Sequence, residues 1–273
     1  MRNPAALRAP VARLTTQITR RSFGSTARCL TAPANGDAAA AAPALNPRWL
    51  SDLQARIKRC ASLGLEGQQK EELKALQETV DGQWLELLAG REGFLTGRYG
   101  YGSPLQMQRV HNLTAAGHVN NVVYNKYAES ARFNWIRHFA NTLDPEHKDE
   151  WNALMSPRSV GLIMRSIKTE YKFPMAYPDY LTVFHKITSK PTYESDFINL
   201  EGLLVSEKHR RPAARCFEDN VVYDYRTAKK TPLFPFMVDH LRATYDAQER
   251  IKAECEEKVK GLVEVVERLE KAA

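Results

Sequence analysis

Apolar residues recur at three- and four-residue steps from Arg48 to about Gly90, and this spacing predicts helix rather than strand. Gly64 and Gly67 interrupt the pattern, so we expect two helices instead of one. Further glycines follow at short intervals as far as Gly102. They do not form the G-x-x-x-x-G-K pattern of a phosphate-binding loop, and we interpret the segment as a connector.

A second helical pattern extends from His118 to about Ala140. Its apolar face is formed by residues at four-residue steps: Val123, Tyr127, Ala131, Trp135 and Phe139. A short strand is expected just before it, around Leu105–Leu113. Helical spacing returns past Phe236 and predicts an amphipathic C-terminal helix, for which a partner-binding coiled coil is the alternative.

Between these two helical regions, apolar and polar residues alternate in the manner of half-buried strands. Four successive strands are expected, around residues 163–173, 181–187, 197–206 and 215–225. The run Lys208-His209-Arg210-Arg211-Pro212 is expected to form a turn between the last two. One long helix followed by consecutive strands implies an antiparallel sheet wrapped around that helix, an α+β fold.

The net charge of +7 suggests a nucleic-acid partner at first sight, but its distribution argues against one. Residues 1–36 hold six arginines and no acidic residue, so the remainder of the 273-residue chain is close to neutral. A protein that works by neutralising phosphates needs its positive charge on the folded domain.

The first 36 residues have the composition of a mitochondrial transit peptide, because they are rich in arginine, contain Ser and Thr, and lack acids. Arg20-Arg21-Ser22-Phe23 resembles a matrix-processing site; a basic tail without a targeting role is the alternative. No segment has the uninterrupted apolar length of a membrane span. The four cysteines have neither zinc-site nor disulfide-framework spacing.

The most distinctive segment is Gly117-His118-Val119-Asn120-Asn121, which leads into the second helical pattern. A glycine turn that opens directly onto a helix aims unpaired backbone N–H groups and the positive end of the helix dipole at whatever lies in front. Such a helix end can hold a carbonyl oxygen. In the form G-H-V-N-N-x-x-Y-x-x-Y-x-E-x-A-R, the segment resembles the hotdog-fold acyl-CoA thioesterases of the 4-hydroxybenzoyl-CoA thioesterase type.

The resemblance extends from about Arg48 to His240. It includes Tyr171-Lys172-Phe173-Pro174, Tyr177-Pro178-Asp179 and Tyr223-Asp224-Tyr225-Arg226, and it looks closest to a fungal mitochondrial thioesterase-like branch. It implies a hotdog fold, an antiparallel sheet wrapped around a long central helix, with extra N- and C-terminal helices. It also implies a homodimer or tetramer with an acyl-CoA pocket between subunits. Coenzyme A would enter as substrate, with no cofactor and no metal.

The resemblance assigns the carbonyl-polarising groups to the backbone N–H groups of Asn121 and Asn120, with Gly117 and Tyr124 lining the substrate site. Related enzymes carry a catalytic aspartate three residues before the glycine. Here that position is Thr114, whose side chain cannot accept a proton near neutral pH as a carboxylate would.

Three side chains are candidates to replace the missing carboxylate. Glu129 is one, as a buried base, although Arg132 at i+3 offers it an ion pair instead. His111 is another, as a base for water or for Thr114, with a hydrogen-bonded strand histidine as the commoner situation. His118 belongs to the motif and is expected to order the turn, line the pocket or transfer protons.

Coenzyme A also carries phosphates, and Lys208, Arg210, Arg211 and Arg215 gather where two strand patterns meet. Guanidinium and ammonium groups at such loop tips can clamp phosphate. Solvated turn charges are the alternative interpretation.

We therefore predict a mitochondrial matrix thioester hydrolase that acts on acyl-CoA or an acyl carrier. The expected parts are a transit peptide (1–36), a linker (37–47), a helical extension with its connector (48–102), a hotdog domain (103–235) and a C-terminal helix (236–273). Two alternatives stay open: a catalytically impaired acyl-thioester-binding or structural partner, and a thioesterase of a lipid or polyketide biosynthetic pathway.

Overall fold

The computed structural model describes residue 46 and residues 48–97, 108–109 and 117–272. The predicted leader, most of the predicted linker and most of the first predicted strand fall outside these residues. None of the helices in the described ranges is long and apolar enough to cross a bilayer.

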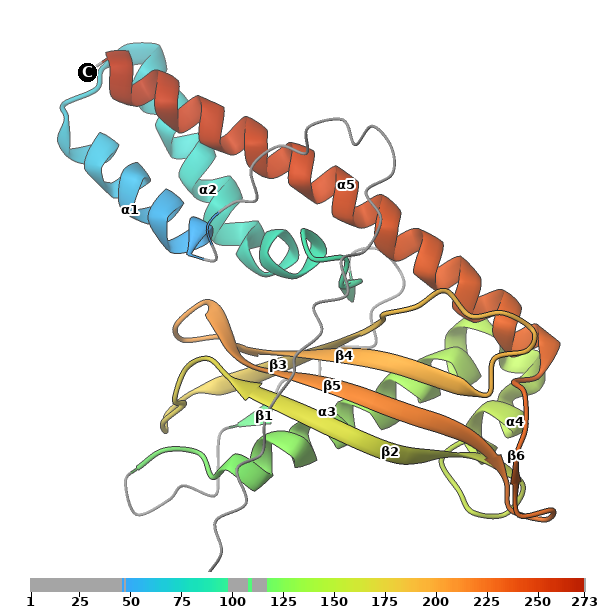
Figure 1. The fold of residues 1–273 in the computed structure, drawn as a ribbon. Coiled ribbons are helices and arrows are strands. Elements are labelled where there is room, and N and C mark those ends of the chain that lie inside the picture. The colour runs from blue at the N-terminus through green and yellow to red at the C-terminus, as the bar shows by residue number, and fades with distance from the viewer. Residues whose placement is uncertain (1–45, 47, 98–107, 110–116, 273) are drawn as a thin grey trace, which may run out of the picture. The chain divides into compact units, whose positions relative to one another are not determined.

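The described strands form a single antiparallel sheet with the order β1-β3-β4-β5-β2, and β6 pairs with β5. The strands are β1 (Gln108–Arg109), β2 (Val160–Tyr171), β3 (Tyr180–Ile187), β4 (Phe197–Ser206), β5 (Arg211–Asp224) and β6 (Lys229–Lys230). One long helix, α3 (Asn121–His138), packs on one face of this sheet (Figure 1). The hotdog arrangement predicted from the sequence is confirmed.

Helix α3 buries the predicted apolar face against the sheet. Val123, Tyr127, Ala131 and Trp135 are all buried at four-residue steps. The helix begins at Asn121, three residues later than predicted, because His118 forms a β-bridge with Ala176 and holds the preceding segment extended. After His138 the chain continues as a π-helix, Phe139–Leu143.

The strand β5 begins at Arg211, four residues earlier than predicted. Arg211 pairs with Ser206 across the hairpin, so the predicted turn over residues 208–212 is shorter than the charge run suggested. Arg210 supplies a positive φ of 48°, which lets the chain reverse within this shorter turn.

The other face of the sheet is covered by a layer of three helices, α1 (Trp49–Ser62), α2 (Gly67–Gly90) and the long α5 (Pro235–Ala272) (Figure 1). Both predicted N-terminal helices and the predicted C-terminal helix are confirmed. Gly90 lies where α2 crosses α5, and a Cβ there would stand 2.6 Å from Cys255 Sγ. The close contact explains a glycine at the end of an otherwise regular helix.

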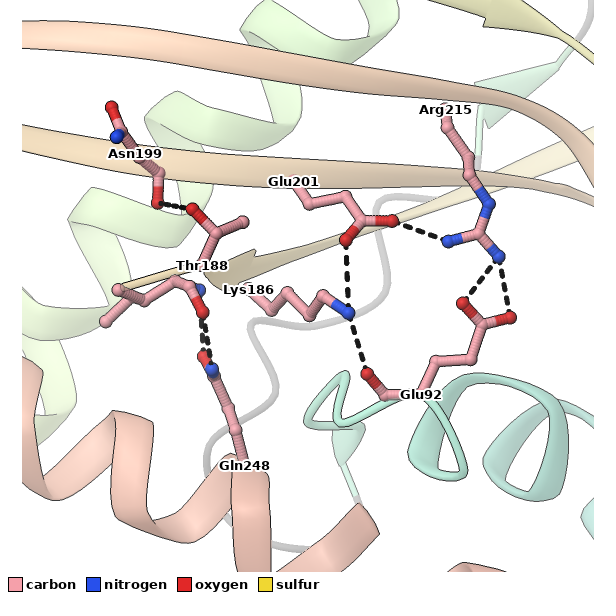
Figure 2. A network of polar contacts seen from close by, with 8 residues as sticks. Glu92, Lys186, Thr188, Asn199, Glu201, Arg215 and Gln248 are labelled. Carbon is pink, nitrogen blue, oxygen red and sulfur yellow. Dashed lines mark hydrogen bonds and ion pairs between the residues drawn. The ribbon is translucent and has the colours of Figure 1, made fainter. Parts of the chain in front are cut away.

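A charged network joins this helical layer to the sheet (Figure 2). Arg215 on β5 contacts Glu201 on β4 and Glu92 beyond α2, each at 2.5 Å. Lys186 on β3 binds Glu201 at 3.1 Å and donates to the carbonyl oxygen of Glu92 at 2.8 Å. Two cations thus pair with two carboxylates. The guanidinium of Arg215 is part of this network within the fold and is not a phosphate ligand.

A buried aspartate ties the end of the α3 segment to α5. Asp144 accepts hydrogen bonds from Trp151 Nε1 and His147 Nδ1, each at 2.9 Å, and lies 3.5 Å from His240 Nε2. Burial raises the pKa of Asp144, but the hydrogen bonds from Trp151 and His147 outweigh burial and hold it below its usual value. The His147 ring also stacks on Phe236 of α5, with centroids 3.8 Å apart.

This cluster predicts a pH-dependent contribution to stability. The hydrogen bond to Asp144 raises the pKa of His147, and Glu146 and Glu150 act in the same direction. Because the folded-state pKa is raised, the stabilisation is complete below the unfolded value of about 6.5 and is lost as pH rises through the folded value. We expect the difference in Tm between wild type and His147→Gln to be larger near pH 5.5 than near pH 8.5. A difference that stays constant with pH would contradict this assignment.

Candidate functional site

The turn before α3 requires a glycine because of its backbone conformation and not because of close packing. Gly117 has a φ of +77°, a region that L side chains rarely adopt, and an added Cβ would meet no atom within 4 Å. After this turn, the Val119 N–H donates to the carbonyl oxygen of Met175 at 2.8 Å. The segment is thereby fixed against the end of the sheet, and the start of α3 has a defined direction.

Asn120 caps the start of α3. Its side-chain Oδ1 accepts from the Val122 N–H at 3.1 Å, and its carbonyl oxygen accepts from the Val123 N–H at 2.9 Å. In the described part of the chain, no group accepts a hydrogen bond from the Asn121 N–H. The first amide of α3 is therefore available to a ligand, with the helix dipole aligned behind it.

A cleft of about 260 Å³ lies at this helix tip. Its lining residues come from the motif, from the last residue of β2 and from the three residues after that strand: His118, Val119, Asn121, Tyr124, Tyr171, Lys172, Phe173 and Pro174. Asn120 and Asn121 are both exposed, so the tip is not covered by packed side chains. The structure thus brings His118, Asn121 and Tyr124 together at one opening. Residues 171–174 were part of the resemblance but were not assigned to the site; only the fold places them there.

Two tyrosines brace the cleft wall. Tyr124 Oη accepts from the Met175 N–H at 3.2 Å, and Tyr171 Oη donates to the Asn121 carbonyl oxygen at 3.2 Å. Their rings pack edge to face with centroids 5.3 Å apart. Burial raises the pKa of both hydroxyls, so both stay protonated near neutral pH and position the helix tip rather than act as bases.

Of the residues predicted to replace the missing carboxylate or to occupy its position, one is contradicted by the structure and two lie outside the described residues. Glu129 is exposed on α3, so the prediction of a buried base is wrong. The suggested ion pair is wrong as well, because Arg132 turns into the core and binds Glu218 at 2.8 Å. Thr114 and His111 lie outside the described residues.

His118 is the side chain of the described lining that suits proton transfer. The lining otherwise offers one lysine and two tyrosines as titratable groups, and no carboxylate. Imidazole is the side chain that exchanges protons near neutral pH. Geometry therefore favours His118 over Glu129 for that role.

The predicted phosphate ligands are not equivalent in the structure. Arg210 binds Asp81 of α2 at 2.5 Å, and its guanidinium lies 5.7 Å from the Trp84 ring centroid. Arg211 lies 4.6 Å over the ring of Phe173, which lines the cleft at the helix tip. The Lys208 side chain is exposed and lines a different cleft, between α1, α2 and the β4–β5 hairpin.

A buried charged triad between α3 and the sheet was not predicted from the sequence. Glu218 lies between Arg132, at 2.8 Å, and His185, whose Nε2 is 3.5 Å away. A Cβ at Gly202 would stand 3.3 Å from that Nε2, so the glycine leaves room for the imidazole. Burial raises the pKa of Glu218, but His185 and Arg132 outweigh burial and hold it below its usual value. A glutamate on the inward-facing register of a core strand is the signal that could have revealed the triad.

One family model matches half of the chain. The profile described as "Thioesterase-like superfamily" matches residues 107–243. Similar solved structures include a Thermus thermophilus thioesterase complexed with coenzyme A and zinc, 20% identical, with a TM-score of 0.40 over 57% of this chain and 97% of that one. Another is a hypothetical protein from Staphylococcus aureus in complex with CoA, 17% identical, with a TM-score of 0.41 over 52% of this chain and 82% of that one. A probable thioesterase from Escherichia coli is 18% identical, with a TM-score of 0.40 over 53% of this chain and 97% of that one. No curated protein matches the chain.

Proposed function

The chain belongs to the thioesterase-like superfamily, and on that premise we propose that it hydrolyses an acyl-CoA or acyl-carrier thioester to a carboxylic acid and a thiol. Within the family we assign it to the 4-hydroxybenzoyl-CoA thioesterase type and to a fungal mitochondrial branch, on the residues of the motif. The arginine-rich, acid-free leader supports a place in the mitochondrial matrix.

The observation that carries the proposal is the Asn121 N–H, which has no acceptor among the described residues and belongs to a residue that lines a cleft. A thioester carbonyl oxygen seated there accepts this hydrogen bond, and the helix dipole stabilises the negative charge that develops as the carbon is attacked. A preorganised donor of this kind contributes about 10²–10³ in rate. Val119, Phe173 and Pro174 supply apolar wall for the chain on either side of the ester.

The remaining step is the attack of water. His118 accepts a proton as the water oxygen bonds to the carbonyl carbon, which gives a tetrahedral intermediate. When the carbon–sulfur bond breaks, the imidazolium returns the proton to the departing thiolate. The reaction then balances as thioester plus water giving acid plus thiol.

The free edge of the sheet supports assembly as a homodimer. β2 ends the strand order, and its 12 residues have no described partner on the outer side. Ile163 on this strand is 37% exposed. An exposed edge of this length is suited to pairing with the same strand of a second copy.

The test of hydrolysis uses the position of the missing carboxylate. We expect the purified protein to cleave a panel of acyl-CoA and acyl-carrier thioesters slowly, and Thr114→Asp to raise kcat at least tenfold, because a positioned base contributes about 10²–10⁴. Thr114→Asn is the matched control, since its amide cannot act as a base, and it should leave kcat low.

Three outcomes would redirect the proposal. Fast turnover by the wild type would show that no carboxylate is needed at Thr114, and His118→Ala and His111→Ala would then identify the base. Binding of acyl-CoA without turnover by any variant would favour the non-catalytic alternative, in which the fold kept the pocket after losing the carboxylate. A preference for acyl-carrier over acyl-CoA substrates would favour the biosynthetic alternative.

A further inference from the structure

A second cleft, of about 270 Å³, is lined by residues of the β4–β5 hairpin, α1 and α2. Its floor is apolar, because Ile57 of α1 and Val80 of α2 are 3% and 1% exposed. Its rim is polar and carries the side chains of Gln54, Lys58, Gln77, Asp81, Lys208, His209 and Arg210. Residues from three separate elements therefore converge on one opening.

The rim has an excess of positive charge. Asp81 is its carboxylate, and Arg210 already binds it at 2.5 Å. Lys58 and Lys208 are exposed, and neither ammonium group has an acidic partner among the residues that the structure describes. Two uncompensated ammonium groups beside a guanidinium and an imidazole favour an anion with several oxygens, such as a phosphate ester.

This basic cleft adjoins the cleft at the tip of α3 through an aromatic pair. His209 lines the basic cleft, and Phe173 lines the cleft of the helix tip. Their ring centroids are 4.7 Å apart, and the Arg211 guanidinium lies over the Phe173 ring at 4.6 Å. The two clefts are therefore linked by direct contact between side chains that line them.

We propose that the basic cleft binds the phosphate groups of the coenzyme A moiety while the thioester lies at Asn121. The inference rests on the proposed function, and it assigns a role to α1 and α2. Both helices lie outside the residues 107–243 that match the family, so this part of the site is an addition of this chain to the shared domain. Lys58 and Lys208 are the direct phosphate ligands, and the Asp81–Arg210 pair fixes the hairpin beside them.

Calorimetric titration of the purified full chain tests the proposal with three ligands: coenzyme A, dephospho-coenzyme A, which lacks the 3′-phosphate, and pantetheine, which lacks the nucleotide. We expect Lys58→Gln to weaken the binding of coenzyme A about fivefold at low salt, because a charged hydrogen bond is lost from an exposed site. Pantetheine should bind all variants equally.

Lys70→Gln is the matched control, because it makes the same charge change on an exposed position of α2 that does not line the cleft. A loss at Lys58→Gln confined to coenzyme A assigns the 3′-phosphate to the cleft, and an equal loss with dephospho-coenzyme A assigns the diphosphate; either supports the proposal. Unchanged coenzyme A affinity in Lys58→Gln, or an equal loss in Lys70→Gln, overturns it.

The proposed hydrolysis is tested apart from this cleft by turnover of an acyl-pantetheine substrate. Absence of turnover together with Lys58-dependent coenzyme A binding refutes the enzyme and leaves the phosphate cleft standing. Turnover of acyl-pantetheine together with coenzyme A binding that does not depend on Lys58 supports the enzyme and overturns the phosphate cleft. Failure to bind coenzyme A at all overturns the phosphate cleft, and turnover of acyl-pantetheine then decides the enzyme.

Discussion

Replacing Asn121 by proline is expected to lower kcat for thioester hydrolysis about 10²–10³-fold while leaving the fold intact. The substitution deletes the one backbone N–H that we assign to the carbonyl oxygen, and a single such donor is worth about that factor. Proline suits the position structurally. Asn121 is the first residue of α3, where proline is favoured, and Asn120 has an extended ψ of 138°, which a following proline requires.

The matched control is Asn121→Ala, which removes the same side chain and keeps the N–H. Steady-state kinetics of both variants, measured in the Thr114→Asp background if wild-type turnover is slow, should show a large loss for proline alone. Thermal unfolding should show similar Tm values for the two. A proline variant with the kinetics of the alanine variant would remove the N–H from the mechanism.

Glu218→Gln is expected to destabilise the protein by about 3–5 kcal/mol, the cost of removing one partner from a buried ion pair. Its carboxylate is fully buried between Arg132 of α3 and His185 of β3. The glutamine keeps the shape but leaves the Arg132 charge uncompensated beneath the helix. Because this contact fixes α3 to the sheet, we also expect the helix tip to be held less firmly.

Urea unfolding measures the effect, and Asp219→Asn is its control on the next residue of β5. Asp219 pairs with Arg165, whose side chain is 58% exposed, so that substitution should cost about 1 kcal/mol or less. Near-equal midpoints for the two variants would mean that the Arg132–Glu218 pair contributes no more than a surface pair. The free energies of unfolding would then assign the anchoring of α3 to its apolar face.

The hydrophobic pattern was sufficient for most of the fold because the three- to four-residue repeat of a helix and the two-residue alternation of a strand can both be read from neighbouring residues. The α3 face and the strand β4 were predicted from spacing alone, and the structure confirms them. The boundaries that failed were set by distant contacts. The bridge from His118 to Ala176 delays the start of α3, and the pairing of Arg211 with Ser206 extends β5 into a predicted turn.

The same division holds for the site. The sequence by itself determined the glycine turn that opens onto a helix and the absence of a carboxylate at Thr114, because each of these depends on neighbouring residues in the chain. Only the tertiary structure decided that Arg132 turns away from Glu129 toward Glu218, and that Lys58 and Lys208 share one cleft. The spacing of charged side chains along the sequence does not reveal their partners. The partner depends on which side chains are buried and on which elements lie side by side, and both are properties of the folded chain only.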